Sequence, residues 1–427
     1  MLNRTPLAAC AVAVALVSAL TVTSSWASDW PQFQGPERTG MSPETGLAHT
    51  WPEGGPKTLW AFSTQEGFSG PAIRDGEVYF LDREESLRDV LRCLSLESGT
   101  ILWETSYDAA GSTSYNGSRT TPTITADHVY TVGLLGQFTC FDRKSHAILW
   151  QKDLSKEHKT DVPNWGFSQS PSLYKNLVIV APQAPDAFVA AYDQKSGDQI
   201  WASEELGGVG YSSPLVTTLD GQDQVVMVTA PGGKNGTVAG LSLEDGAVLW
   251  SYDNWQCKIP IPNATLLSDN RLFITGEYGA GSAMIQVKKD GDRFSVHELF
   301  TTDKLGSQIH QPLVIDNVLY ANSNGNKRRD GMVCMALDGE LLWRTEDKQD
   351  LPSFERGNLL FADGMILNLD GNTGILHLIT PSTKEYVEIA RAPVLDGKKI
   401  WSPMALSNGM LVVRSQSEMK CLDLRKS

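Results

Sequence analysis

The sequence is poor in cysteine and in positive charge. Its 427 residues include 6 cysteines, and none are in C-x-x-C spacing, so metal, redox and haem-attachment motifs are absent. Lysine and arginine total 36 against 50 for aspartate and glutamate, which gives a net charge of -14. This acidic balance argues against nucleic acid and anionic membranes as general partners, because both are bound by an excess of basic residues.

Long apolar stretches are also scarce. The one candidate is Leu7–Leu20, which follows a short basic segment ending at Arg4. Ser25 and Ala27 place small residues at the positions that signal peptidase recognises, so residues 1–27 are predicted to be a cleaved signal peptide. A membrane anchor is the alternative, but the apolar run is too short to span a bilayer comfortably. We therefore expect an exported protein, periplasmic or secreted, with no transmembrane segment after cleavage.

Familiar catalytic motifs are missing as well. The sequence has no H-E-x-x-H, G-x-S-x-G or P-loop pattern, and its 7 histidines are scattered. Each of these motifs sets a nucleophile, a metal ligand or a phosphate-binding backbone in a defined place. The sequence therefore predicts no catalytic residue and no metal ligand.

What the sequence does contain is a repeat with a period near 50 residues. In its clearest copy, Cys93–Trp103, alternating residues, a Ser-Gly turn and a returning Ile-Leu-Trp segment predict a β-hairpin. Met284–Ser295 and Leu376–Tyr386 are degenerate copies without the tryptophan. A period of this length is typical of propellers and solenoids. The other copies are Cys140–Trp150, Ala191–Trp201, Gly240–Trp250 and the slightly shorter Cys334–Trp343.

Eight tight turns divide the chain into eight units. Each unit has a short strand, a two-residue turn and a strongly apolar strand before its hairpin, which makes about four strands per unit. Most turn residues are Asp, Asn or Gly, which tolerate the positive φ of tight hairpins. The turns are Asp75-Gly76, Asp127-His128, Lys175-Asn176, Asp220-Gly221, Asp269-Asn270, Asp316-Asn317, Asp363-Gly364 and Asn408-Gly409.

The two ends of the repeat region complement each other. Thr58–Ser63 contains a tryptophan but no hairpin partner, whereas Met419–Leu424 lacks its returning strand. The N-terminal strand is therefore predicted to complete the last sheet, which closes a ring and protects its edges. We predict an all-β fold: an eight-bladed β-propeller of four-stranded antiparallel blades over residues 58–427. A Pro/Gly/Trp-rich arm at residues 28–57 is expected to pack on it.

The recurrent tryptophans are predicted to be structural. Because they return at a fixed period, packing between repeats explains them better than stacking on a cofactor. Each large ring buries enough area to contribute several kcal/mol to the repeat that holds it. These predicted docking residues are Trp60, Trp103, Trp150, Trp201, Trp250 and Trp343.

The hairpin-plus-tryptophan repeat resembles the PQQ-type propeller repeat with its tryptophan-docking motif. That repeat occurs in pyrroloquinoline-quinone alcohol dehydrogenases and in BamB, the propeller subunit of the outer-membrane assembly machine. The resemblance covers Thr58 to Ser427, and Trp30–Gly40 is similar to the opening of exported bacterial PQQ-like repeat proteins. Such repeats specify a fold, while function depends on the site built upon it.

The resemblance to the dehydrogenases implies PQQ on a tryptophan floor, a bound Ca²⁺, an aspartate base and, in many, a vicinal disulfide. This sequence has no Cys-Cys pair, and its units average under 50 residues, which leaves little room for the insertions that shape those active sites. It therefore looks like a member of the non-enzymatic exported branch, with no cofactor predicted.

A binding surface remains to be placed. In a propeller, the loops that lead into the innermost strands gather around the axis on one face. Here they combine aromatic rings with polar and basic groups, as ligand pockets do, and the basic groups suggest an anionic ligand or partner loop. The alternative is that each residue satisfies loop backbone or fills the channel. The candidates are Phe68, Tyr115, Asn116, Arg119, Trp165, Phe167, Gln169, Tyr211, Lys258, Gln308, His310, Arg356 and Trp401.

The predicted function is therefore that of an exported, monomeric, non-catalytic propeller that binds a protein or polymer partner, similar in role to BamB. The first alternative is a PQQ-dependent oxidoreductase, which would require PQQ with calcium. The second is a small-molecule sensor that uses the axial funnel. Nucleic acid is not an expected partner.

Overall fold

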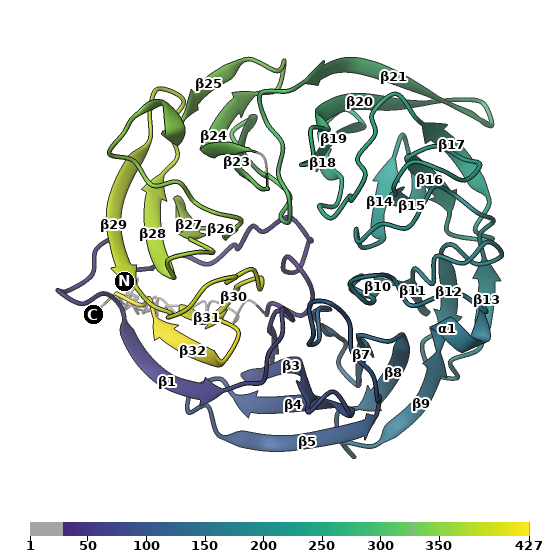
Figure 1. Cartoon of the computed structure of the whole chain (residues 1–427), viewed down its shortest axis with the longest axis horizontal. Helices are drawn as coiled ribbons and strands as arrows, with labels where there is room; N and C mark the ends of the chain where they lie inside the picture. The colour runs from purple at the N-terminus through teal and green to yellow at the C-terminus, as the bar shows by residue number, and fades with distance from the viewer. Residues whose placement is uncertain (1–28, 327, 427) are drawn as a thin grey trace, which may run out of the picture.

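The computed structural model of the chain describes residues 29–326 and 328–426. The predicted signal peptide lies outside these residues. Eight four-stranded antiparallel sheets stand side by side in a ring, and the chain passes from one sheet to the next around the axis (Figure 1). The predicted eight-bladed β-propeller is therefore confirmed.

Seven of the eight blades take four successive strands from the axis outward. The first three blades are β2 (Ala72–Arg74), β3 (Glu77–Glu84), β4 (Arg88–Ser95), β5 (Ile101–Asp108); β6 (Thr123–Ile124), β7 (His128–Val132), β8 (Gln137–Asp142), β9 (Ile148–Asp153); and β10 (Ser172–Tyr174), β11 (Leu177–Val180), β12 (Ala190–Asp193), β13 (Gln199–Ala202). A single helical turn, α1 (Leu154–Glu157), follows β9.

The next four blades repeat the same order. They are β14 (Leu215–Leu219), β15 (Gln222–Val228), β16 (Val238–Ser242), β17 (Val248–Tyr252); β18 (Thr265–Leu267), β19 (Arg271–Gly276), β20 (Gly281–Asp290), β21 (Arg293–Thr302); β22 (Leu313–Ile315), β23 (Val318–Asn324), β24 (Arg329–Ala336), β25 (Leu341–Arg344); and β26 (Asn358–Ala362), β27 (Met365–Leu369), β28 (Ile375–Thr380), β29 (Val387–Pro393). A short 3₁₀ turn, η1 (Thr345–Asp347), follows β25.

The eighth blade joins the two ends of the described chain. It contains β30 (Ala405–Ser407), β31 (Met410–Arg414) and β32 (Glu418–Asp423), and its outer strand is β1 (Lys57–Ser63). β1 pairs antiparallel with β32, with Trp60 opposite Cys421. The predicted closure of the ring by the N-terminal strand is therefore confirmed.

In the register of each tryptophan-bearing hairpin, a small residue lies opposite the tryptophan. Gly240 shows why, since a Cβ built on it would lie 2.1 Å from Nε1 of Trp250. At Gly240 any side chain would therefore collide with the indole, and the other five positions hold cysteine or alanine, whose side chains are small. The five cysteines of the described residues are free and buried, and four of them hold this position. The pairs are Cys93–Trp103, Cys140–Trp150, Ala191–Trp201, Gly240–Trp250, Cys334–Trp343 and Cys421–Trp60.

Four tryptophans contact the hairpin of the next blade through the indole N–H. Each donates to a backbone carbonyl there, and three of the rings lie over a glycine of the same turn (Gly99, Gly197 and Gly246). The bonds run from Trp60 to Leu96 (2.7 Å), Trp150 to Gln194 (3.2 Å), Trp201 to Leu243 (3.0 Å) and Trp343 to Ser382 (2.8 Å).

The other two tryptophans differ. Trp103 stacks on His146, with ring centroids 4.6 Å apart, because histidine stands where the other turns have glycine. Trp250 donates instead to Gln224 of its own blade, at 2.5 Å.

The degenerate repeats have longer hairpins than the sequence suggested. β21 extends to Thr302, and Phe300 pairs with Met284 at the tryptophan position. A Cβ on Gly339 of the next blade would lie 3.0 Å from this ring, so Phe300 packs on the neighbouring turn as the tryptophans do. In the seventh blade Ala390 holds the equivalent place opposite Leu378.

Six of the eight tight turns have positive φ at both central residues, as predicted. Asp127-His128 is an exception, because the Thr125 hydroxyl accepts from both backbone N–H groups (3.3 and 2.9 Å) and forms a different turn. At Lys175-Asn176 only the lysine has positive φ. Side-chain capping therefore replaces the two-residue hairpin in the second blade.

The N-terminal arm, purple in Figure 1, crosses the ring before it reaches β1. Trp30 pairs with Ile73 in the first blade. On the far side, Gly40 accepts a backbone hydrogen bond from Phe361 in the seventh blade, at 2.9 Å. The Glu44 carboxylate then accepts from the backbone N–H groups of the Asn408-Gly409 turn, both at 2.7 Å.

The middle of the arm lies across the axis. The Arg38 guanidinium donates to the carbonyl of Pro171 in the third blade. The Arg38 carbonyl accepts from Gln311 in the sixth blade at 2.7 Å, on the opposite side of the ring. Arg38 is 6% exposed. The middle of the arm thus lies in the channel against residues that lead into the inner strands, while Glu44 contacts a tight turn at the other end of those strands.

Within the described ranges, the helices are too short to cross a membrane.

Candidate functional site

An axial cavity of about 210 Å³ lies among the loops that lead into the innermost strands. These loops and the tight turns are at opposite ends of the inner strands, so the cavity is on the face away from the tight turns, and Phe33 of the arm reaches it. Nine of the thirteen predicted residues line it. They are Phe68, Tyr115, Arg119, Trp165, Tyr211, Gln308, His310, Arg356 and Trp401.

The other four predicted residues lie elsewhere. Asn116 donates to the Ser86 hydroxyl at 2.8 Å, and Gln169 donates to the carbonyl of Gly210 at 2.8 Å. Phe167 is 1% exposed and packs against a loop glycine. Lys258 lines a neighbouring surface groove. The hydrogen bonds of Asn116 and Gln169 fit the alternative that polar side chains in these loops bond to other loop atoms.

The cavity also contains residues that the sequence did not indicate. Phe33 comes from the arm and Tyr278 from the β19–β20 loop. Asn326 comes from the β23–β24 loop. The arm's path across the axis has no periodic signal, so nothing in the sequence placed Phe33 there. The missed residues are Phe33, Ser168, Ser213, Ile261, Asn263, Tyr278, Ile309, Asn326 and Pro403.

Stacked aromatic rings and guanidinium groups form part of the wall. The rings of Phe68 and Trp401 are stacked, with centroids 5.5 Å apart and planes 19° from parallel. The Arg119 guanidinium lies 4.7 Å from the Phe68 ring and that of Arg356 lies 5.2 Å from the Trp401 ring. Each cation–π contact contributes about 0.5–2 kcal/mol, depending on its desolvation. The stack therefore holds both cations at the cavity.

The two arginines differ in the hydrogen bonds and ion pairs that their guanidinium groups make. Arg356 donates from Nε to Gln308 (2.6 Å), from one terminal nitrogen to Glu355 (2.9 Å) and from the other to Asn326 (2.5 Å). Arg119 donates to the carbonyl of Tyr115 and has no ion pair among the described residues. Burial lowers the pKa of Arg119 to about 10, which leaves it charged at neutral pH.

His310 is a neutral hydrogen-bond donor. The Asn358 side-chain oxygen accepts from the backbone N–H of Met404 (3.0 Å), so its amide nitrogen faces Nδ1 of His310 (3.2 Å). Nδ1 is then the acceptor, and the proton of the neutral ring lies on Nε2. Burial lowers the pKa of His310 to about 4. The ring is therefore uncharged at neutral pH, with a donor at Nε2.

Comparison with known proteins gives the family. A family model described as outer membrane protein assembly factor BamB matches residues 87–326, more than half of the chain. The chain belongs to the BamB family. Among curated BamB-family relatives, BamB of Shewanella oneidensis is 25% identical over 243 residues, which cover 53% of this chain and 56% of that protein. BamB of Yersinia pestis is 25% identical over 259 residues, covering 58% and 61%. The matched region spans less than two thirds of either relative.

Solved structures support the same propeller. A europium-containing methanol dehydrogenase is 12% identical with a TM-score of 0.65, covering 90% of this chain and 89% of that one. BamB from Moraxella catarrhalis is 15% identical with a TM-score of 0.55, covering 86% and 99%. At these identities the likeness concerns the fold alone, which BamB-family proteins and quinoprotein dehydrogenases share.

The lining of the cavity does not suit the calcium that the dehydrogenase resemblance implies. Ca²⁺ binds six to eight oxygen ligands, with carboxylates prominent among them. The described residues that line this cavity include no aspartate or glutamate. Elsewhere in the described residues, no group of three or more His, Cys, Asp and Glu side chains could hold a metal ion. In this member of the BamB family, we derive no reaction through PQQ and calcium.

Buried His310 predicts a pH dependence of stability. Its folded-state pKa is about 4, below the ordinary value of 6.5, so between these values the unfolded chain binds a proton that the folded protein does not. Stability therefore falls as pH falls through this window, by about 2–3 kcal/mol between pH 7 and 4.5. Chemical denaturation gives the free energies of unfolding of the wild type and of His310→Gln. The difference between the two is expected to change by this amount between pH 7 and 4.5. A constant difference would contradict a neutral His310.

Proposed function

We propose that this chain is an exported, non-catalytic propeller that binds a partner protein through the face that carries the axial cavity. One observation carries the proposal: the lining combines aromatic rings and hydrogen-bond donors without any carboxylate. Such a set can recognise a bound group, and its described residues include no carboxylate that could act as a base or bind a metal ion. The curated relatives, which are named assembly factors, support a role in binding.

A surface groove extends the proposed binding face outward from the cavity. Trp165 and Tyr211 line both, and their rings lie 5.3 Å apart at 46°. Lys258 and Val209 line the groove, and Val209 is 43% exposed. Aromatic residues are enriched in the cores of protein interfaces. The groove therefore offers the area that a partner loop needs beside the cavity.

We further propose that the protein works in the periplasm or outside the cell without a resident cofactor. The basic start and apolar run before Ala27 support export. Two alternatives remain distinguishable by calorimetry with PQQ and Ca²⁺. Micromolar binding accompanied by dye-linked alcohol oxidation would replace the proposal with the oxidoreductase, and binding without oxidation would favour the sensor.

Partner capture tests the proposed face. Trp165→Ser is expected to weaken retention of the partner about 30-fold, because truncating a central interface tryptophan removes about 2 kcal/mol or more. The measurement is affinity purification from the native envelope with the tagged wild type and the variant, followed by titration of the captured protein.

Leu149→Ser is the matched control. Leu149 is 47% exposed on β9, at the outer edge of the ring, so its replacement should leave capture unchanged. If Trp165→Ser captures the partner as well as the wild type does, the axial face is not the binding surface.

A further inference from the structure

We propose that the axial cavity captures a free carboxylate carried on a flat, apolar group about the size of one amino-acid residue. The source is either the last residue of a polypeptide chain or a small free acid. This inference deepens the proposed function by giving the chemistry of the group that enters the cavity, and it rests on that function only for the identity of the partner.

Four side-chain N–H donors on the lining are buried and make no hydrogen bond of ordinary geometry with any described residue. By contrast, every buried side-chain oxygen of the described lining residues has a hydrogen-bond partner. Leaving such a donor unpaired costs about 1–3 kcal/mol, so a group rich in acceptors would be favoured there. The donors are Asn263 Nδ2, His310 Nε2, Arg119 Nε and Trp401 Nε1.

Two of these donors are fixed by the loops behind them. Asn263 is 3% exposed, and its side-chain oxygen accepts from the backbone N–H of Ser213 (2.9 Å) and the Ser212 hydroxyl (3.3 Å). Its amide nitrogen is thereby left as the free end. His310 is 7% exposed, and the hydrogen bond at Nδ1 leaves its proton on Nε2. Both donors are preorganised, so a ligand meets them without reordering the loops.

The charge of the lining favours a single anionic group. Arg119 has no ion pair among the described residues, whereas the three guanidinium nitrogens of Arg356 already donate to protein atoms. A guanidinium with free donors matches a carboxylate in a planar, two-bond geometry. Among the described lining residues, Arg119 is the cation without an ion pair, and the other unpaired donors are neutral, which suits a monoanion such as a carboxylate.

The size and walls of the cavity define the rest of the ligand. An engineered protein cavity of roughly 150 Å³ binds benzene, so about 210 Å³ leaves room for one ring and a carboxylate. This is below the range of roughly 300–1,000 Å³ for drug-sized ligands. Stacked Phe68 and Trp401 offer a flat wall, and Phe33, Ile261 and Ile309 add apolar surface. The ligand body is therefore flat and apolar.

Calorimetry with matched acids and amides tests the inference on the whole protein. The probes are the tetrapeptide Ala-Ala-Ala-Phe as the free acid, the same peptide as its C-terminal amide, and phenylacetate. The free acid is expected to bind at least tenfold more tightly than the amide. Arg119→Gln should reduce binding of the acid at least tenfold and leave the amide unchanged, while Arg119→Lys retains part of the preference.

Arg344→Gln is the control, since Arg344 lies on the outer strand β25 and pairs with Asp347 at 2.7 Å. It should bind the acid as the wild type does. Tighter binding of the peptide acid than of phenylacetate supports a chain end, and tighter binding of phenylacetate supports a small free acid. Equal binding of acid and amide, or no binding of either at millimolar concentration, overturns the inference.

The outcome is separable from that of the proposed function. If the acids do not bind while Trp165→Ser still loses the envelope partner, the carboxylate inference fails and partner binding stands. If the acids bind and Arg119→Gln abolishes this, the inference stands even where Trp165→Ser captures the partner normally.

Discussion

Replacing Trp201 by alanine is expected to lower the free energy of unfolding by about 3–5 kcal/mol. The side chain is buried, with 6% of its surface exposed. Its ring lies over Gly246, and its indole N–H donates to the carbonyl of Leu243 at 3.0 Å. Both contacts belong to the next blade, so truncation would remove packing between blades and leave a cavity that the rigid turn cannot fill. Urea denaturation followed by far-ultraviolet circular dichroism measures the loss.

The adjacent residue provides the matched control. Ile200 lies on the same strand, β13, but it is 53% exposed and points away from the interface between blades. Ile200→Ala should change the free energy of unfolding by no more than about 0.5 kcal/mol, as surface substitutions usually do. Equal effects of the two substitutions would mean that Trp201 does not connect the blades.

The architecture was predictable because the repeat reappears in the register of the strands. A tryptophan returns opposite a small residue, and this spacing defines a hairpin wherever it occurs. The unpaired Trp60 segment at one end and the incomplete hairpin at Cys421 at the other implied that the two would meet. They pair directly in the structure. Local period and strand pattern thus determined both the blade number and the closure.

The degenerate blades show where pattern reasoning is less accurate. In the fifth blade Phe300 occupies the position that tryptophan holds in other blades. The longer hairpin places it several residues beyond where the repeat spacing predicts a tryptophan. Phenylalanine has no indole N–H, so the hydrogen bond to the next blade is lost while the packing on Gly339 is kept. A motif defined by one residue type cannot detect that substitution.

The candidate site was predictable only in part, for a related reason. Loops before the inner strands reach the axis in any propeller, so residues such as Arg119 and Trp401 could be placed by topology. Topology does not say which way a loop side chain turns, and Gln169 turns to the backbone of Gly210 instead. Phe33 depends on a non-periodic arm that crosses the whole ring, which only tertiary contacts determine.

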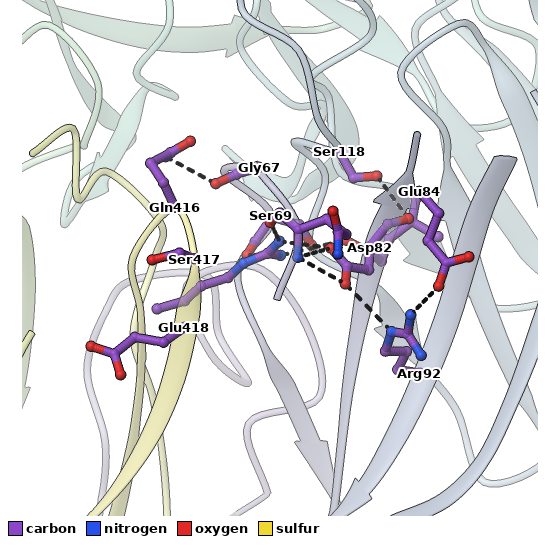
Figure 2. A network of polar contacts seen from close by, with 12 residues as sticks. Gly67, Ser69, Asp82, Glu84, Arg92, Ser118, Gln416, Ser417 and Glu418 are labelled. Carbon is purple, nitrogen blue, oxygen red and sulfur yellow. Dashed lines mark hydrogen bonds and ion pairs between the residues drawn. The ribbon is translucent and has the colours of Figure 1, made fainter. Parts of the chain in front are cut away.

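A buried ion pair connects the last blade to the first, beside the strand pairing that closes the ring. Arg414 on β31 donates to Asp82 on β3 at 3.2 Å, and their side chains are 0% and 1% exposed. Arg414 also donates to the carbonyls of Ser69 (3.1 Å) and Gln65 (3.2 Å). Figure 2 shows Asp82 at the centre of these contacts, with Arg92 approaching it from within the first blade. Burial lowers the pKa of Arg414, and the Asp82 carboxylate opposes this shift.

Arg414→Met is therefore expected to lower the free energy of unfolding by about 3–5 kcal/mol, the range for a buried ion pair that loses one partner. Asp82 would keep Arg92, at 3.4 Å, and the backbone N–H of Gln65, at 3.3 Å, and the carbonyls of the first blade would lose their donor. Thermal and urea denaturation of the purified variant measure the effect.

Arg425→Met is the control. Like Arg414, Arg425 forms an ion pair with an aspartate, here Asp423 of the eighth blade at 2.7 Å, but the Arg425 side chain is 51% exposed. An exposed pair contributes about 0–1 kcal/mol, so this variant should remain close to the wild type. The double variant Arg414→Met with Asp82→Leu should recover part of the loss, since an apolar pair can replace a buried ion pair at little cost. If Arg414→Met is no more destabilising than Arg425→Met, the junction between the first and last blades is held by the β1–β32 pairing without help from this ion pair.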